Sequence, residues 1–179
     1  RRVSEMASFF GIQHWFYRNV AELSGGQKQL LNLASVMALQ PGVLILDEPT
    51  GQLDPIAAGE FLAALGRINR ELGTTVILTE HRLEEAFPLA TDVAVMEKGR
   101  ILCTGAPAAL GAALRREQWG QFAALPDPMR IWAAVDAEEP CPVTVGQGRV
   151  WLEDFAREHP LHPLPPEKIP EAGEMVLRA

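Results

Sequence analysis

Cysteine is scarce in this sequence and long hydrophobic runs are absent, and each shortage excludes a class of protein. Cys103 and Cys141 are the only cysteines among 179 residues, too few for the disulfide framework of a small secreted domain, so a reducing compartment is favoured. No apolar run approaches the roughly 18 residues of a membrane-spanning helix, so any membrane role has to involve a partner. The chain also lacks an initiator Met and an apolar signal segment at Arg1, and we interpret residue 1 as a position inside a longer protein.

The remaining composition is that of an ordinary globular protein with one domain and an appendage. Hydrophobic residues make up 47% of the chain and charged residues 22%, and both values are typical of folded domains. The formal net charge is −7 at pH 7. Domains that bind nucleic acid usually present a basic face, so this charge argues against a nucleic-acid partner without excluding one.

Hydrophobic periodicity predicts alternating helices and strands as far as about residue 105. Apolar residues recur at helical spacing over 27–40, and another helix has Asp54 as its N-cap, Pro55 at its first position and Gly73 at its end. The apolar run at 43–46 is typical of a central parallel strand. The predicted elements are helices at 2–19, 27–40, 54–72 and 82–88 and strands at 43–46, 75–79, 92–96 and 99–105. This order predicts an α/β fold with a parallel sheet and right-handed crossovers.

The composition changes beyond about residue 119, where nine of the 14 prolines lie. Only short elements fit between these prolines, such as "PVTVG" and "RVWLEDFAREH". We therefore divide the chain into a main part, residues 1–118, and a small, irregular C-terminal extension or linker, residues 119–179.

The stretch "LILDEPT", residues 44–50, is an apolar strand that runs into two adjacent acids, Asp47 and Glu48. Ligands bind at the carboxyl edge of open parallel sheets. An aspartate there can hold Mg²⁺, while the next acid polarises a water for attack on a γ-phosphate. Two acids alone would more often be a solvated strand end, but the four apolar residues before them and the Pro-Thr turn after them favour a site.

The stretch "LSGGQKQ", residues 23–29, has the features of a helix N-terminus. Ser24 can cap the helix. Gly25 and Gly26 let the backbone approach an anion, where exposed N–H groups and the positive end of the helix dipole favour a phosphate. A plain N-cap followed by a glycine turn would have the same residues, so this stretch alone is weak evidence.

A single histidine, His81, follows the strand predicted at 75–79. Parallel strands place it at the same sheet edge as Glu48, so His81 could contact the same phosphate. A surface histidine that caps the next helix explains this residue equally well.

Together these segments resemble the ATPase subunit of ABC transporters. "LSGGQ" is similar to the signature motif of that family, and "LILDEPT" is similar to its Walker B strand with the catalytic acid. "GQLDP", residues 51–55, resembles the D-loop, and "ILTEH", residues 77–81, resembles the strand with the switch histidine. The four motifs follow the family order within residues 22–105. The resemblance implies the α/β, parallel-sheet core of a P-loop ATPase, of which this chain would hold the C-terminal part with the helical signature segment.

A finer resemblance is to the energy-coupling-factor subgroup, which serves vitamin and metal-ion importers. The stretch from Thr50 to Ile101 carries it, together with "LPDPMRIW", "PVTVGQGRVWL" and "EMVLRA", which resemble the segment between two ATPase units of tandem members. The resemblance implies a second ATPase unit, in the same or another chain, and a transmembrane transporter subunit as partners. It also implies a cytoplasmic location, peripheral on the inner face of the cell membrane.

The resemblance implies a role for each matching residue, with ATP and Mg²⁺ as cofactors. Asp47 would support Mg²⁺, Glu48 would act as general base or orient the attacking water, and His81 would contact the γ-phosphate. Asp54 would couple the two sites of a dimer. Four residues would close over a nucleotide held by the opposite subunit: Ser24, Gly25, Gly26 and Gln27.

The loop that should hold the phosphates is not in the sequence. Such a loop requires G-x-x-x-x-G-K-[ST], and none of the lysines, Lys28, Lys98 and Lys168, has those neighbours. We expect this loop, the aromatic that stacks on adenine and the glutamine loop to precede residue 1. The fragment should then expose part of a sheet edge and hydrolyse ATP very weakly or undetectably by itself.

Two other functions stay open. A non-transport ATPase of the same superfamily, acting on nucleic acid or the ribosome, can share the signature motif and the Walker B strand. The acidic charge and the stretch "TEHRLEEAFPLA" favour transport over that alternative. A binding or regulatory fragment without catalysis is the second alternative. The transported substrate cannot be read from these residues, because selectivity in this family resides in membrane or binding subunits.

Overall fold

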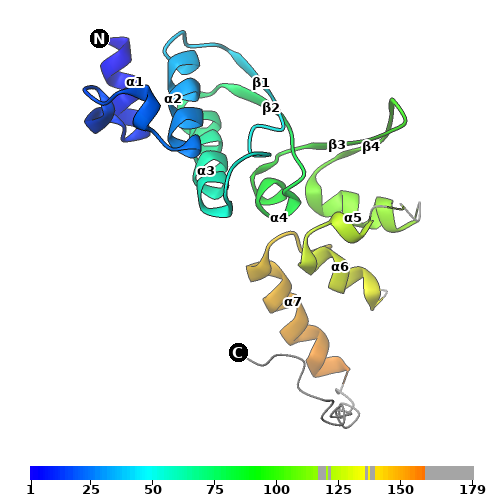
Figure 1. The fold of residues 1–179 in the computed structure, drawn as a ribbon. Coiled ribbons are helices and arrows are strands. Elements are labelled where there is room, and N and C mark those ends of the chain that lie inside the picture. The colour runs from blue at the N-terminus through cyan, green and yellow to red at the C-terminus, as the bar shows by residue number, and fades with distance from the viewer. Residues whose placement is uncertain (117–119, 121, 136, 138–139, 160–179) are drawn as a thin grey trace, which may run out of the picture.

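Two hydrophobic clusters, one after the other along the chain, hold the fold together. Figure 1 shows the arrangement of the helices and strands. The computed structural model describes residues 1–116, 120, 122–135, 137 and 140–159. In chain order, with η for a short 3₁₀ helix, the elements are α1 (Arg2–Phe10), η1 (Gln13–Trp15), η2 (Val20–Glu22), α2 (Gly25–Met37), β1 (Val43–Asp47), α3 (Pro55–Leu72), β2 (Thr75–Thr79), α4 (Leu83–Ala86), η3 (Phe87–Leu89), β3 (Val93–Glu97), β4 (Arg100–Gly105), α5 (Pro107–Arg116), η4 (Phe122–Ala124), α6 (Asp127–Ala134) and α7 (Val145–Glu158).

The first helix, α1, is shorter than predicted, because it ends at Phe10 instead of continuing to residue 19. Gly11 follows it in the left-handed conformation, with a φ of 70°. The Ile12 N–H then donates to the Ala7 carbonyl at 2.8 Å, which is the closing bond of a Schellman motif. A glycine in that conformation stops a helix whatever apolar pattern follows, so the prediction at 2–19 was wrong beyond residue 10.

The parallel sheet core consists of β1 and β2, joined through α3 as predicted. The register pairs Val43 with Thr75 and Asp47 with Thr79. Asp54 caps α3, Pro55 is its first residue and the left-handed Gly73 ends it, so the predicted boundaries of this helix are confirmed.

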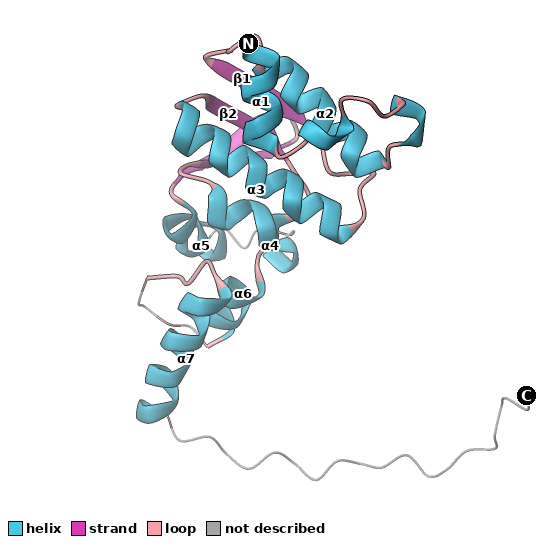
Figure 2. Cartoon of the chain, turned by 90° about the vertical axis from the view of Figure 1, so that its left-hand side faces the viewer, coloured by secondary structure: helices cyan, strands magenta, loops and turns pink. Residues whose placement is uncertain are grey.

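Helices cover one face of this two-stranded sheet. Figure 2 shows α1, α2 and α3 layered on the same side of β1 and β2, and Leu44 is buried against them. Side chains alternate between the faces of a strand, so the other face carries Ile45, which is 72% exposed, and Ile77, which is 52% exposed. The described part of the chain therefore leaves an apolar face of this sheet open, which is a different surface from the sheet edge whose exposure was predicted.

The prediction that the strand at 92–96 belongs to the parallel sheet is wrong. Within the described residues β3 pairs antiparallel with β4, and these two strands form a sheet of their own. Lys98 and Gly99 join them with φ angles of 49° and 76°, as in the two-residue hairpin turns that match strand twist. This turn favours local pairing of neighbouring strands over pairing with β2.

The second cluster joins the β3–β4 hairpin to the C-terminal helices. Trp132 and Met129 of α6 are buried in it together with Leu110 of α5 and Trp151 of α7. The extension is thus more helical than its prolines suggest, since α7 has 14 residues and begins with a capping box of Thr144 and Gln147.

The predicted division of the chain at residues 118 and 119 falls outside the described residues, as do residues 160–179 of the extension. The division therefore stays a prediction. None of the helices in the described part of the chain combines the length and hydrophobicity that a bilayer span requires.

Cys141 gives the second cluster a measurable pH dependence. Burial raises the pKa of its thiol from 9.0 to about 12, against the opposing effect of Arg115. As pH rises above 9, the unfolded chain loses this proton before the folded chain does. The contribution of the buried thiol to the free energy of unfolding is therefore fully present below pH 9 and declines towards pH 12. Between about pH 8 and about pH 10 we expect the free energy of unfolding in urea to fall by roughly 1 kcal/mol through this group.

A pair of single-cysteine variants isolates this effect. Cys141→Ala should lose that part of the pH dependence, whereas Cys103→Ala, which removes the half-buried cysteine of the same cluster, should keep it. An unchanged pH dependence in Cys141→Ala would contradict the assignment.

Candidate active site

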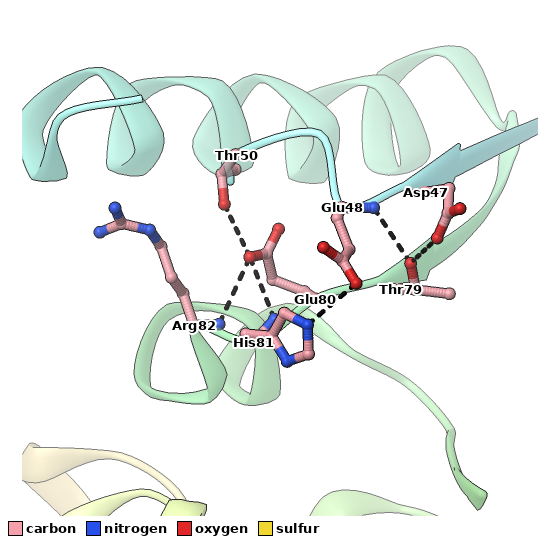
Figure 3. Close-up of polar contacts among 7 residues, drawn as sticks. All are labelled: Asp47, Glu48, Thr50, Thr79, Glu80, His81 and Arg82. Carbon is pink, nitrogen blue, oxygen red and sulfur yellow. Dashed lines mark hydrogen bonds and ion pairs between the residues drawn. The ribbon is translucent and has the colours of Figure 1, made fainter. Parts of the chain in front are cut away.

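The carboxyl ends of β1 and β2 bind each other through polar side chains (Figure 3). The hydroxyl of Thr79 donates to Oδ1 of Asp47 at 2.5 Å. The backbone N–H of Glu48 lies 3.0 Å from the Thr79 hydroxyl oxygen and 3.1 Å from the Thr79 carbonyl oxygen, and both can accept from it. Thr79, the last residue of β2, therefore fixes both the acid that ends β1 and the acid that follows it.

The predicted meeting of Asp47, Glu48 and His81 at one rim is confirmed. Nε2 of His81 lies 2.9 Å from Oε1 of Glu48, next to the strand end that holds Asp47 (Figure 3). The two side chains are 83% and 55% exposed, respectively. Groups so open to water gain little stability from each other, so this contact contributes little to folding.

Glu48 has an unusual backbone conformation. Its φ is 43°, in the left-handed region that residues other than glycine seldom occupy. The Gly51 N–H donates to the Glu48 carbonyl at 3.1 Å and closes the turn. Strained conformations of this kind cluster at functional sites and are held there by their surroundings. The turn directs the Glu48 side chain from the end of β1 towards the segment that follows β2 (Figure 3).

The signature segment begins α2 with a complete capping box. The Ser24 hydroxyl accepts from the Gln27 N–H at 3.3 Å, and Oε1 of Gln27 accepts from the Ser24 N–H at 3.0 Å. The predicted N-cap is confirmed. Gly26 has a packing role as well, since a Cβ there would lie 2.7 Å from the Cβ of Ala57. The glycine therefore lets the N-terminal ends of α2 and α3 approach each other.

Asp54 lies at the N-terminus of α3. Its Oδ1 accepts from the N–H groups of Ile56 at 3.0 Å and Ala57 at 2.9 Å. The carboxylate thus caps the helix that connects β1 to β2, and the residue has a structural role independent of any contact with a second subunit.

The residues present fit Mg²⁺ and a nucleotide phosphate only as partial ligands. No group of three or more possible metal-ligating side chains occurs in the described residues. Mg²⁺ commonly uses one or two carboxylates together with water and substrate phosphates, and the exposed Asp47 can supply such a carboxylate. The N–H groups of Gly25 and Gly26, the first of α2, lack acceptors within the helix and can face a phosphate.

The polar residues that hold this rim in place were not predicted from the sequence. Thr79 could have been found, because the parallel register sets it opposite Asp47. The other contacts join residues far apart in sequence: Thr50 with Glu80, Leu53 with Arg82, and Gln29 with Pro49. No spacing pattern reveals such pairs, since they depend on the path of the loops.

Comparison with known proteins gives consistent similarities. Residues 1–51 match the family model for ABC transporters. A protein of Bacillus anthracis, named as an ABC transporter ATP-binding protein, is 47% identical over 156 residues, which cover 87% of this chain and 28% of that protein. The energy-coupling factor transporter ATP-binding protein EcfA2 of Clostridium tetani is 40% identical over 109 residues, which cover 60% of this chain and 38% of that protein.

A solved structure shows the same fold. The structure of cbiO1 from Clostridium perfringens, part of the ABC transporter complex cbiONQ, matches with a TM-score of 0.58 at 32% identity, over 69% of this chain and 51% of that one. The predicted fold class, the α/β core of a P-loop ATPase, is thereby confirmed. In each of these comparisons the chain spans less than two thirds of the protein it matches, and only 28% of the Bacillus protein.

The capping box of α2 can be tested through stability. Ser24→Ala removes the acceptor of the Gln27 N–H, so we expect the free energy of unfolding in urea to fall by about 1 kcal/mol. Amide hydrogen exchange at Gln27 should quicken. Ser35→Ala is the matched control, because the Ser35 hydroxyl donates within the same helix to the Leu31 carbonyl and its loss should change stability by less than about 0.5 kcal/mol. Equal losses in both variants would contradict the cap.

Proposed function

We propose that this chain, which carries part of an ABC transporter ATP-binding domain, provides the side chains that face the γ-phosphate in the ATPase motor of a membrane importer. One observation carries the proposal: Glu48 and His81 are in contact, beside Asp47, at the carboxyl rim of the parallel sheet. Three polar side chains that converge at such a rim form a place where a phosphate and a water can react.

We propose a task for each of these side chains, and their contact at the rim supports it. Glu48 accepts a proton from the attacking water as the bond to the γ-phosphorus forms and ADP leaves. His81, on the other side of the 2.9 Å contact, orients Glu48 and donates to a γ-phosphate oxygen. Mg²⁺, with Asp47 among its ligands, would neutralise charge on the phosphates.

The signature segment acts on a nucleotide bound elsewhere in the assembly. We propose that the N–H groups at the start of α2 close over an ATP held by a second ATPase unit, with Ser24 and Gln27 fixing the helix end. Asp54, which caps α3, would couple the two sites of that dimer. The partners are thus a second ATPase unit and a transmembrane transporter subunit, on the cytoplasmic face of the membrane.

A vitamin or metal-ion importer of the energy-coupling-factor type is the subgroup that we propose. Support comes from the EcfA2 relative and from the match to cbiO1, part of the complex cbiONQ. The resemblance of the stretch from Thr50 to Ile101 to this subgroup agrees with both.

The chain alone should hydrolyse ATP very weakly or undetectably. None of its three lysines lies in a phosphate loop, and such a loop supplies most of the contacts that hold the phosphates. The measurement is phosphate release from the purified chain with Mg-ATP. Clear ATP hydrolysis by the purified chain that disappears in the Glu48→Gln variant would overturn this expectation.

The full-length gene product that contains these residues tests the proposed function itself. We expect it to hydrolyse Mg-ATP, and Glu48→Gln to lower kcat by about 10²–10⁴-fold, which is the range contributed by a general base. Glu60→Gln, an exposed carboxylate on α3, is the control and should leave kcat unchanged.

The partner distinguishes the importer from the alternatives. Co-purification of the tagged full-length protein with a transmembrane protein supports the importer. Co-purification with nucleic acid or ribosomes supports a non-transport ATPase instead. Absence of any turnover in the full-length protein would favour a fragment without catalysis.

A further inference from the structure

We propose that Glu80 is a positioning residue for the Glu48–His81 pair, because its carboxylate fastens the turn that carries His81 to the loop that follows Glu48. The proposal concerns a residue to which none of the motifs assigns a task. It rests on the proposed function for its effect on catalysis, but the fastening itself is a matter of geometry.

One oxygen of Glu80 accepts from three donors (Figure 3). The Thr50 hydroxyl donates to Oε1 at 2.7 Å, the His81 N–H at 3.1 Å and the Arg82 N–H at 3.3 Å. The first donor lies in the loop after β1 and the other two in the turn after β2. A single carboxylate therefore joins the two segments that carry the reacting side chains.

The reacting pair needs such support. Glu48 and His81 lie largely in water, as their contact has to if a substrate is to reach it, and exposed charged side chains hold each other weakly. Thr50, in contrast, is 0% exposed. Water does not compete for its hydroxyl, so the bond to Glu80 is a firmer constraint than the contact it supports.

A second contact strengthens the same connection. The Arg82 guanidinium donates through one nitrogen to the Leu53 carbonyl at 3.0 Å. The Leu53 N–H donates to the Thr50 carbonyl at 2.9 Å. The turn after β2 is thus attached near both ends of the loop between Glu48 and Asp54, and the His81 backbone lies between the two attachments.

The second oxygen of Glu80 lowers the net stability that this carboxylate can contribute. Oε2 is buried and has no hydrogen-bond partner among the described residues. A buried acceptor without a partner destabilises a fold. Such a costly group is expected where function requires it, and the function that the geometry supports is the placement of His81.

Amide hydrogen exchange tests the fastening in this chain without any catalysis. In Glu80→Ala the His81 and Arg82 N–H groups lose their acceptor, and we expect them to exchange at least about tenfold faster. Glu80→Gln keeps an oxygen at the same place and should restore most of the protection. Thr50→Val, which replaces the hydroxyl with a methyl group, should raise exchange at the same amides by a smaller factor.

The matched control is Glu85→Gln on α4, a carboxylate near Glu80 in sequence that takes no part in these bonds. It should leave the exchange of both amides unchanged, and amides of α5, α6 and α7 should stay as protected as in the wild type in every variant. Unchanged exchange at His81 and Arg82 in Glu80→Ala would overturn the proposal.

The full-length gene product tests the effect on catalysis. We expect Glu80→Ala to lower kcat about tenfold with KM for ATP changed less than about twofold, and Glu80→Gln to lie between this variant and the wild type. If Glu80 acts through His81, adding Glu80→Ala to His81→Ala should cause no further loss of kcat. A merely structural role would make the two losses multiply, and that result would overturn the proposal.

The two sets of measurements separate the possible failures. A wild-type protein that hydrolyses no ATP contradicts the proposed function, and the amide exchange still decides whether Glu80 fastens the turn. A wild-type protein that is active, with Glu80→Ala equally active, contradicts the positioning role and leaves the proposed function intact.

Discussion

The candidate site depends on the register of two short parallel strands. Asp47 and Thr79 are partners in that register, and the Thr79 hydroxyl bridges the Asp47 carboxylate and the Glu48 N–H. Side chains alternate along a strand, so a slip of one residue would turn Thr79 to the other face and break both bonds. Leu44 of β1 and Val76 and Leu78 of β2 pack in the cluster beneath the helices. Their packing favours this register and thereby couples the hydrophobic core to the geometry of the rim.

Buried polar residues support the exposed side chains of this rim. Under the proposed function Glu48 and His81 face a substrate, and their exposure means that they stabilise each other only weakly. Thr50 is fully buried and Glu80 is half-buried. The hydrogen bond between their side chains connects the two backbone segments from which Glu48 and His81 project. This arrangement follows a general rule that functional side chains keep their geometry through the residues behind them.

At the start of α2, side chains and backbone groups likewise have different roles. The Gln27 side chain accepts a hydrogen bond from the Ser24 N–H, and the Ser24 side chain accepts one from the Gln27 N–H. Both side chains therefore stabilise the helix end. Gly25 and Gly26 contribute backbone N–H groups, which remain directed out of the helix. The close approach of Gly26 to Ala57 adds a packing constraint that any side chain would violate. Gly26 therefore serves the contact between the two helices, and under the proposed function the absence of a side chain would also leave room for an anion.

The sequence by itself determined what depends on neighbouring residues. Asp54, Pro55 and Gly73 specify the limits of α3 through capping chemistry, and two apolar runs predict β1 and β2. A topological rule then brings Asp47, Glu48 and His81 to one rim, because the carboxyl ends of parallel strands share an edge. Gly11 is an equally local signal for the end of α1. The apolar residues that follow Gly11 suggested a longer helix and obscured this signal.

Only the tertiary structure decided the contacts between distant residues. The pairing of β3 with β4 instead of β2, the packing of Trp132 and Trp151 in one cluster, and the bond from Thr50 to Glu80 are all of this kind. Each joins segments whose relative position follows from how the helices pack and how the loops run. Periodicity and capping patterns relate only residues that lie close together in the sequence. They therefore contain no information on which donor and acceptor from distant segments form a hydrogen bond.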